Sequence, residues 1–327
     1  MRRLVGAALI GVSAAAGAQP VLDPQWTAGL AARRFVEVER AAGARIATNP
    51  DDIDAHAALI RAVLMLNDSA RRDAALKLLE ACLARSPRSA VCHYGVGSVQ
   101  GAQVMSQGML KAALSAGRIR DALQTAVELD ASLYAARSGL VQFYLLAPGL
   151  AGGSTAKATV VAQAGAARQP EHAKALLALV ALSQSRLDDA ERQLASVKPG
   201  DDAELVDDVN GLWIRLAFEY LGLRKAPSAQ PIFDRFIKER PDRSVGHYGL
   251  GRVLSDAGSW EPAIAQFTLA ANLEGAADLP IDYRLGIALQ SADRRDAARA
   301  ALRRFIAAGK GSQKNRDDAE RRLAELR

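Results

Sequence analysis

Apolar residues in the second half of the chain recur in blocks that repeat at one fixed period. Between residues 213 and 275 every apolar or turn position of one block returns 34 residues later in the next. A period of this length predicts one supersecondary unit per block, built of two helices and the turns around them. The matched positions are Trp213, Leu216, Tyr220, Ala229, Phe233 and Pro241 in the first block, and His247, Leu250, Leu254, Ala263, Phe267 and Gly275 in the second.

Residue size within each block follows from how two short helices bury an apolar face. Small residues are needed where helices cross, and large ones fill the space between the crossings. Ala217 or Gly251 on the first helix and Ala229 or Ala263 on the second helix are the small residues. Pro241 stops the second helix, because proline lacks an amide proton and has a fixed φ.

These residues carry a family resemblance. The first block reads Trp213-x2-Leu216-Ala217-x2-Tyr220, then Ala229-x3-Phe233, then Pro241, and it resembles the tetratricopeptide repeat with alanine in place of one glycine. The resemblance implies an all-α chain, folded as a right-handed superhelical solenoid of helix-turn-helix units with a C-terminal capping helix. It also implies a scaffold that binds other proteins through a concave groove, without naming the partner.

The same register can be followed outside the clean blocks, since a turn position precedes the next leucine position by nine residues. Pro50 leads to Leu59 in this way, and Pro87 leads to Val96. The predicted organisation is a signal peptide at 1–18, an N-terminal capping unit at 19–50, repeat-like units at 51–199, clean repeats at 200–311, and a polar capping helix at 312–327.

A second resemblance covers roughly residues 88–170. The stretch beginning at Cys92 carries about ten extra residues within 101–120, and the later segment Ala147–Ser154 reads APGLAGGS before a Lys-Ala pair. Together these features resemble a group of exported bacterial tetratricopeptide-repeat proteins with an APGxxGG turn. That group implies the fold and the compartment, and no activity is attached to it.

The first residues form a secretion signal. Arg2 and Arg3 precede an uncharged run from Leu4, and Ala16-Gly17-Ala18 follows. This pattern is typical of a Sec signal peptide cleaved after Ala18, which would send the chain to the periplasm or outside the cell. The rival interpretation is an uncleaved anchor, but the run is too short and too rich in glycine and alanine. No later segment is apolar enough to span a membrane.

Composition and charge do not indicate a partner other than a protein. Hydrophobic residues make up 50% of the chain but aromatic residues only 5%, because alanine dominates. The net charge of +6 includes Arg2 and Arg3, so the mature chain is only mildly basic. Arginines near the C-terminus alternate with acidic residues, as on a solvated helix face, so no nucleic-acid partner is predicted.

No set of residues indicates catalysis, a cofactor or a metal. His56, His93 and His247 occupy the position of the repeat tryptophan in different units, so they cannot gather around one ion. Gly149–Ser154 is rich in glycine, but no Lys-Ser or Lys-Thr pair closes it as in a phosphate-binding loop. We therefore predict a protein that is not an enzyme and binds no cofactor.

The two cysteines lie close to each other on neighbouring helices. Cys82 is expected on the second helix of one unit and Cys92 on the first helix of the next. In an oxidising compartment such a pair is expected to form a disulfide. The alternative is two buried thiols that pack as small apolar residues.

The resemblance places the concave wall on the first helices, at the positions two residues before and two residues after each leucine position. Positions four residues apart share one side of a helix. The predicted groove combines aromatic rings with guanidinium groups, residue types that are enriched in binding hot spots. Its residues are Tyr94, Tyr248, Tyr283, Arg61, Gln142, Phe218 and Arg252.

Two functions follow from these expectations. The first is an exported scaffold or adaptor that holds an unidentified protein partner in its groove. The second is an envelope factor that binds a glycan, or an accessory subunit of an enzyme or export machine. The sequence defines neither the partner nor the oligomeric state.

Overall fold

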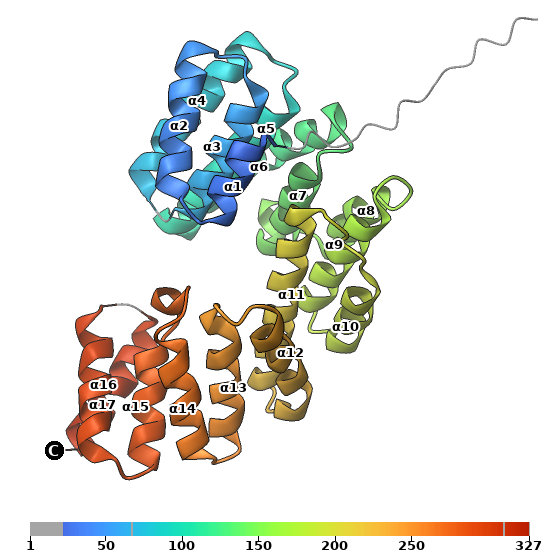
Figure 1. The fold of residues 1–327 in the computed structure, drawn as a ribbon. Helices are drawn as coiled ribbons and strands as arrows, with labels where there is room; N and C mark the ends of the chain where they lie inside the picture. The colour runs from blue at the N-terminus through green and yellow to red at the C-terminus, as the bar shows by residue number, and fades with distance from the viewer. Residues whose placement is uncertain (1–21, 67, 310, 327) are drawn as a thin grey trace, which may run out of the picture. The chain divides into compact units, whose positions relative to one another are not determined.

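The computed structural model describes residues 22–66, 68–309 and 311–326, and within them the fold is all-α (Figure 1). This part of the chain forms 17 α-helices and no β-strand, which confirms the predicted fold class. The predicted signal peptide lies outside the described residues. The chain divides into two compact units, of which the first ends at Ala173 and the second begins at Lys174.

The first unit is a succession of helices in which neighbours along the chain pack against each other. After α1 and α2, each repeat contributes a first helix (α3, α5, α7) and a second helix (α4, α6, α8). The bounds are α1 Pro24–Ala31, α2 Phe35–Thr48, α3 Ile53–Met65, α4 Ser69–Arg85, α5 Ala90–Gln107, α6 Met109–Leu129, α7 Tyr134–Leu146 and α8 Thr155–Ala164, with the start of α9 Pro170–Ser183.

The second unit continues from within α9 in the same way. Its first helices are α11, α13 and α15, and its second helices are α10, α12, α14 and α16. The bounds are α10 Leu187–Ser196, α11 Ala203–Gly222, α12 Ala226–Glu239, α13 Ser244–Asp256, α14 Trp260–Ala270, α15 Ile281–Ser291, α16 Arg295–Ala307 and α17 Gln313–Glu325.

The two compact units meet between Ala173 and Lys174, within α9, whereas the boundary predicted between residues 199 and 200 separates two kinds of repeat. The Pro199-Gly200 turn does separate two helices, but α10 and α11 on either side of it pack together. Turn residues mark where a helix ends and carry no information about packing across the turn. Asp202 caps α11, because its carboxylate accepts a hydrogen bond from the Leu205 amide at 3.1 Å.

The extra residues of the long repeat are divided between two helices. α5 has 18 residues and α6 has 21. The helices meet at Gly108, whose φ of +98° is a conformation that favours glycine. Gln103 ties the extension to α4, since its amide donates to the Ser69 hydroxyl and to the Asp73 carboxylate, each at 2.7 Å.

The glycine-rich turn after α7 is closed by its own backbone. Residues Gly149–Ala151 form one turn of 3-10 helix. The Gly153 amide then donates to the Pro148 carbonyl at 3.1 Å. The Ser154 hydroxyl caps α8 by accepting from the Lys157 amide. The turn therefore ends one helix and starts the next within a few residues.

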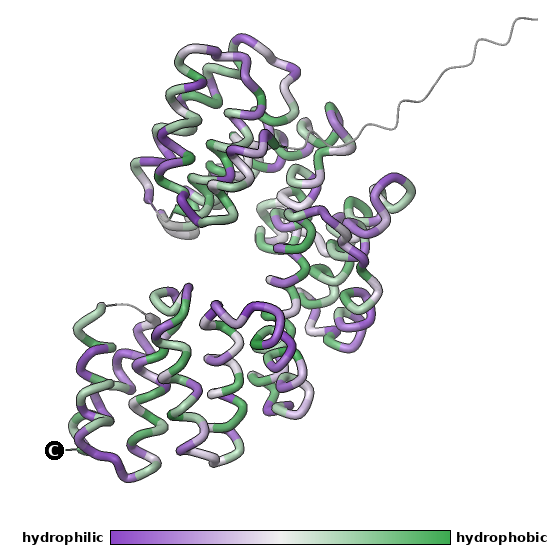
Figure 2. The backbone as a smooth tube through the Cα atoms, viewed as in Figure 1, coloured by the Kyte–Doolittle hydropathy of each residue, from purple (hydrophilic) through white to green (hydrophobic). Residues whose placement is uncertain are grey.

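The predicted small positions lie where helices cross. Ala217, Ala229 and Ala263 are fully buried, and a Cβ atom added at Gly251 would lie 2.6 Å from the Phe267 ring. Hydrophobic and hydrophilic residues alternate along most helices of both units, as expected for amphipathic helices (Figure 2). Packing of apolar faces against small residues therefore holds each repeat together.

The predicted polar capping helix is confirmed as α17. Its Ala319, together with Leu326 just beyond it, is buried in the apolar cluster of the second unit. The other residues of α17 are mostly exposed or half-buried, so this helix covers the last apolar face with a polar surface. Among the described helices, none has the length and apolar character needed to cross a membrane.

We expect Gly153→Ala to destabilise the first unit by about 1–3 kcal/mol, because the new methyl group overpacks the turn. A Cβ atom at residue 153 would lie 1.7 Å from the Ala147 carbonyl oxygen. Gly149→Ala is the matched control, since a Cβ atom there meets nothing within 4 Å. Urea unfolding of both variants measures the difference, and equal stabilities would contradict this account of the turn.

Candidate functional site

The predicted groove residues of the first unit lie on three first helices. Arg61 on α3 and Tyr94 on α5 are half-buried, and Gln142 on α7 is exposed. The Gln142 amide donates to the Ser138 hydroxyl at 3.1 Å, one turn earlier on the same helix. Tyr94 packs against the apolar cluster of this unit. Of the three, Gln142 offers the most accessible polar group.

The second unit corrects the prediction for Tyr248. Its side chain was expected in an open groove wall, but it is only 4% exposed. The ring centroid lies 6.0 Å from that of Phe218 and 5.9 Å from that of Phe267. The Tyr248 ring thus packs between the first helix of the preceding repeat, α11, and the second helix of its own repeat, α14, and is part of the core.

Tyr283, at the corresponding position of α15, is buried as well. It is 7% exposed, and its ring lies 5.2 Å from the Phe305 ring. Its hydroxyl donates to the Asp318 carboxylate of α17 at 2.9 Å. Burial and this hydrogen bond raise the pKa of Tyr283. Tyr283 therefore attaches the capping helix to α15, and its buried ring is not accessible to a binding partner.

Phe218 and Arg252 remain half-buried and lie together. The Arg252 guanidinium carbon is 5.6 Å from the centroid of the Phe218 ring, a cation–π distance. Burial and the charge of Arg284 lower the pKa of Arg252. Of the four residues predicted for this unit, the structure thus brings Phe218, Tyr248 and Arg252 into one contact cluster.

Two arginines of the same unit were missed by the sequence analysis. The Arg284 guanidinium lies 5.5 Å from the Tyr283 ring, and that of Arg235 lies 4.6 Å from the Trp213 ring. Arg284 stands one residue before Leu285, and the prediction considered only steps of two from the leucine. A helix returns to the same side after three residues as well as four, so that spacing could have revealed Arg284.

Comparisons with solved structures agree with the repeat pattern. A chain of the APC/C hetero-tetramer Cut9–Hcn1 matches with a TM-score of 0.54 and 13% identity, over 89% of this chain and 46% of that chain. The present chain therefore spans about half of the length of that relative. The chain has the tetratricopeptide-repeat fold.

Two bacterial tetratricopeptide-repeat proteins match over most of their own lengths. One, from Parabacteroides merdae, has a TM-score of 0.49 and 12% identity, covering 81% of this chain and 96% of that chain. The other, from Thermus thermophilus, has a TM-score of 0.48 and 20% identity, covering 60% of this chain and 96% of that chain. No family model matches the sequence, and no curated protein matches it.

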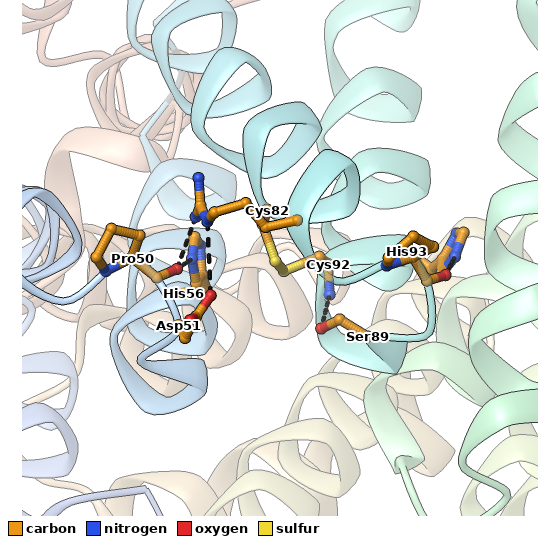
Figure 3. The surroundings of a disulfide bond; sticks show 9 residues. Pro50, Asp51, His56, Cys82, Ser89, Cys92 and His93 are labelled. Carbon is orange, nitrogen blue, oxygen red and sulfur yellow. Dashed lines mark hydrogen bonds and ion pairs between the residues drawn. A yellow bond between two sulfur atoms is a disulfide. The ribbon is translucent and has the colours of Figure 1, made fainter.

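A disulfide crosslinks two successive tetratricopeptide repeats in the first unit. Cys82 of α4 and Cys92 of α5 are joined with an S–S distance of 2.01 Å and a Cα–Cα distance of 6.3 Å (Figure 3). Both side chains are buried. A loop of this length stabilises a fold by about 2–3 kcal/mol on the chain-entropy model. The disulfide therefore holds one repeat against the next.

Two histidines close turns between repeats, whereas His247 Nδ1 lies 2.7 Å from the Gln266 side-chain oxygen of α14. His56 Nε2 lies 3.0 Å from the Pro50 carbonyl, and His93 Nε2 lies 2.9 Å from the Pro87 carbonyl, in both cases six residues back. Arg137 does the same in the next repeat, donating to the carbonyl of Ala131, which stands at the proline position. Each of these side chains thus satisfies a turn carbonyl, which is a structural role.

One histidine also lies beside the disulfide. His56, Cys82 and Cys92 each place a nitrogen or sulfur within 4.8 Å of the other two, a grouping that the sequence analysis did not foresee. Both sulfur atoms belong to the disulfide, so neither is a thiolate that could ligate a metal. Burial lowers the pKa of His56, which favours the neutral form of its ring.

We expect Tyr248→Ala to destabilise the second unit by about 3 kcal/mol, because it leaves a cavity between two phenylalanine rings. This reverses the expectation for an exposed ring. Tyr248→Phe is the control, since it keeps the ring and should stay within about 1 kcal/mol of the original chain. Urea unfolding measures both variants, and an unchanged Tyr248→Ala midpoint would contradict the burial of this ring.

Proposed function

We propose that this chain is an exported scaffold that binds another polypeptide along the first-helix faces of its repeats. The observation that carries the proposal is the tetratricopeptide-repeat fold together with the side chains left accessible on those helices. Gln142 is exposed, and Phe218 and Arg252 are half-buried. Polar, aromatic and guanidinium groups of this kind are enriched in protein interfaces.

The side chains inside the repeats are occupied by packing and by turn hydrogen bonds, so the residues available for binding lie on the surface. The second helices use their large side chains, such as Phe233, Phe267 and Leu302, to fill the space between repeats, and these are fully buried. His56, His93 and Arg137 are engaged with turn carbonyls. The matched Cut9–Hcn1 chain belongs to a hetero-tetramer. By analogy with that assembly, the partner of this chain is a protein.

We further propose that the chain acts in the cell envelope. Arg2 and Arg3, the uncharged run and the Ala16-x-Ala18 spacing support export through the Sec pathway. The Cys82–Cys92 disulfide supports an oxidising compartment, because such bonds persist outside the cytosol. These two observations come from different parts of the chain and favour the same compartment.

Mass spectrometry of the chain isolated from the organism that encodes it tests the compartment. We expect the mature N-terminus to be Gln19, free or cyclised, because small residues at positions 16 and 18 define the cleavage point. The protein should be recovered from the periplasmic or extracellular fraction. Recovery of a chain that retains Met1 from the cytosol would overturn the proposed export.

Site-specific photo-crosslinking tests the binding face. A photoreactive amino acid at Gln142, on first helix α7, is expected to give one discrete polypeptide adduct in intact cells. The same amino acid at Lys77, an exposed residue of second helix α4 in the same unit, is the matched control and is expected to give none.

Three outcomes would count against the scaffold. An adduct at Lys77 alone would move the binding face to the second helices. Equal adducts at both positions would indicate contact without a preferred face. The absence of any polypeptide adduct, with a glycan retained on the purified chain, would favour the alternative of an envelope factor with a non-protein ligand.

A further inference from the structure

Two half-buried arginines on neighbouring first helices of the second unit have no carboxylate partner among the described residues. They are Arg252 of α13 and Arg284 of α15. The Nε atom of each is buried and has no hydrogen-bond partner in the described part of the chain. Other half-buried arginines of this unit are paired, such as Arg243 with Glu274 at 2.8 Å and Arg322 with Asp318 at 2.7 Å.

The register places both guanidinium groups on one side of adjacent helices. Arg252 follows Leu250 by two residues, and Arg284 precedes Leu285 by one. Because Leu250 and Leu285 are equivalent positions, the two arginines are three residues apart in the repeat frame and share a helix side. α13 and α15 also contact each other directly.

The two charges interact unfavourably. After burial, the charge of Arg284 is the largest cause that lowers the pKa of Arg252. Asp256, one turn beyond Arg252, acts in the opposite direction but forms no ion pair with it in the described structure. Two neighbouring cations that are partly removed from water are costly unless an anion lies between them.

Aromatic rings hold both side chains in place. Arg252 lies over Phe218 at 5.6 Å and Arg284 over Tyr283 at 5.5 Å. A planar guanidinium packed on a ring keeps the N–H donors of its edge, and these match the two oxygens of a carboxylate. The side chains are therefore already ordered for an anion before it binds.

We propose that Arg252 and Arg284 form a binding site for a side-chain carboxylate in an acidic segment of the protein partner. The proposal rests on the scaffold function above and adds the chemistry of the partner. Two carboxylates near the site, that of Asp256, which acts on Arg252, and that of Asp318, which accepts from the Tyr283 hydroxyl, disfavour a doubly charged phosphate more than a singly charged carboxylate. A carboxylate bound between the two arginines would accept hydrogen bonds from both and remove their mutual repulsion.

The test uses the full mature chain and two synthetic peptides, hexaglutamate and hexaglutamine, both acetylated and amidated so that their ends are uncharged. We expect hexaglutamate to bind and hexaglutamine to bind at least tenfold more weakly. Arg252→Gln and Arg284→Gln should each reduce hexaglutamate affinity by about ten- to hundredfold, as for loss of a charged hydrogen bond. Arg303→Gln, at an exposed arginine of α16, is the matched control and should keep the original affinity.

A second measurement does not depend on the variants being folded. In the original chain, the 15N signals of the arginine Nε–H groups are followed during the titration, and those of residues 252 and 284 should shift saturably with hexaglutamate. Thermal unfolding should show that both glutamine variants still fold cooperatively, because each position is only half-buried, and the loss of affinity can then be assigned to the guanidinium group.

Several outcomes would overturn the site. One is equal affinity of the original chain for the two peptides, and another is a loss in Arg303→Gln as large as in Arg252→Gln. Shifts of the two signals with inorganic phosphate but not with hexaglutamate would assign the site to free phosphate. If the photoreactive residue at position 142 gives a polypeptide adduct but hexaglutamate does not bind, the arginine site is wrong and the scaffold function stands. If hexaglutamate binds but no polypeptide adduct forms, the scaffold function is wrong.

Discussion

The structure depends on the close approach of each first helix to the second helices on its two sides. In α13 this approach requires a glycine on each side of Leu250. A Cβ atom at Gly249 would lie 2.1 Å from the Phe233 ring of the preceding repeat, and one at Gly251 would lie 2.6 Å from the Phe267 ring of its own repeat. No side chain fits at these distances, so the two rings fill the space that glycine leaves open. The same pattern recurs in α5, where Gly95 faces Leu79 of the preceding second helix, α4, and Gly97 faces Leu123 of its own second helix, α6.

This packing also decides which side chains of a first helix can reach a ligand. Tyr248 and Tyr283 lie beside the rings that fill the crossings, so they are drawn into the core and stabilise the fold. Arg252 lies one helical turn beyond Tyr248 and keeps part of its guanidinium at the surface. An aromatic position and a charged position on the same side of a helix therefore have different functions, because one side chain is rigid and apolar and the other ends in a hydrated group.

Charge pairing separates structural arginines from candidate binding residues. Arg243 and Arg322 are held by carboxylates of this chain, and Arg137 by a turn carbonyl and the Gln169 side chain. Arg252 and Arg284 rest on aromatic rings, and neither forms an ion pair with a carboxylate in the described residues. Where the fold itself satisfies a guanidinium, that group stabilises the fold, and where the fold leaves it unsatisfied, the group can recognise a partner.

The sequence by itself determined the helical repeat, its 34-residue period, the small and large packing positions and the polar terminal helix, because these depend on local periodicity and side-chain size. It also placed the two cysteines on adjacent helices, because only ten residues and one short turn separate them. Only the tertiary structure decided that Tyr248 is buried and that Arg284 lies beside Arg252, because burial depends on the ring contributed by a neighbouring helix. The division at Ala173 likewise depends on which helices contact each other in space, which turn residues such as Pro199 do not encode.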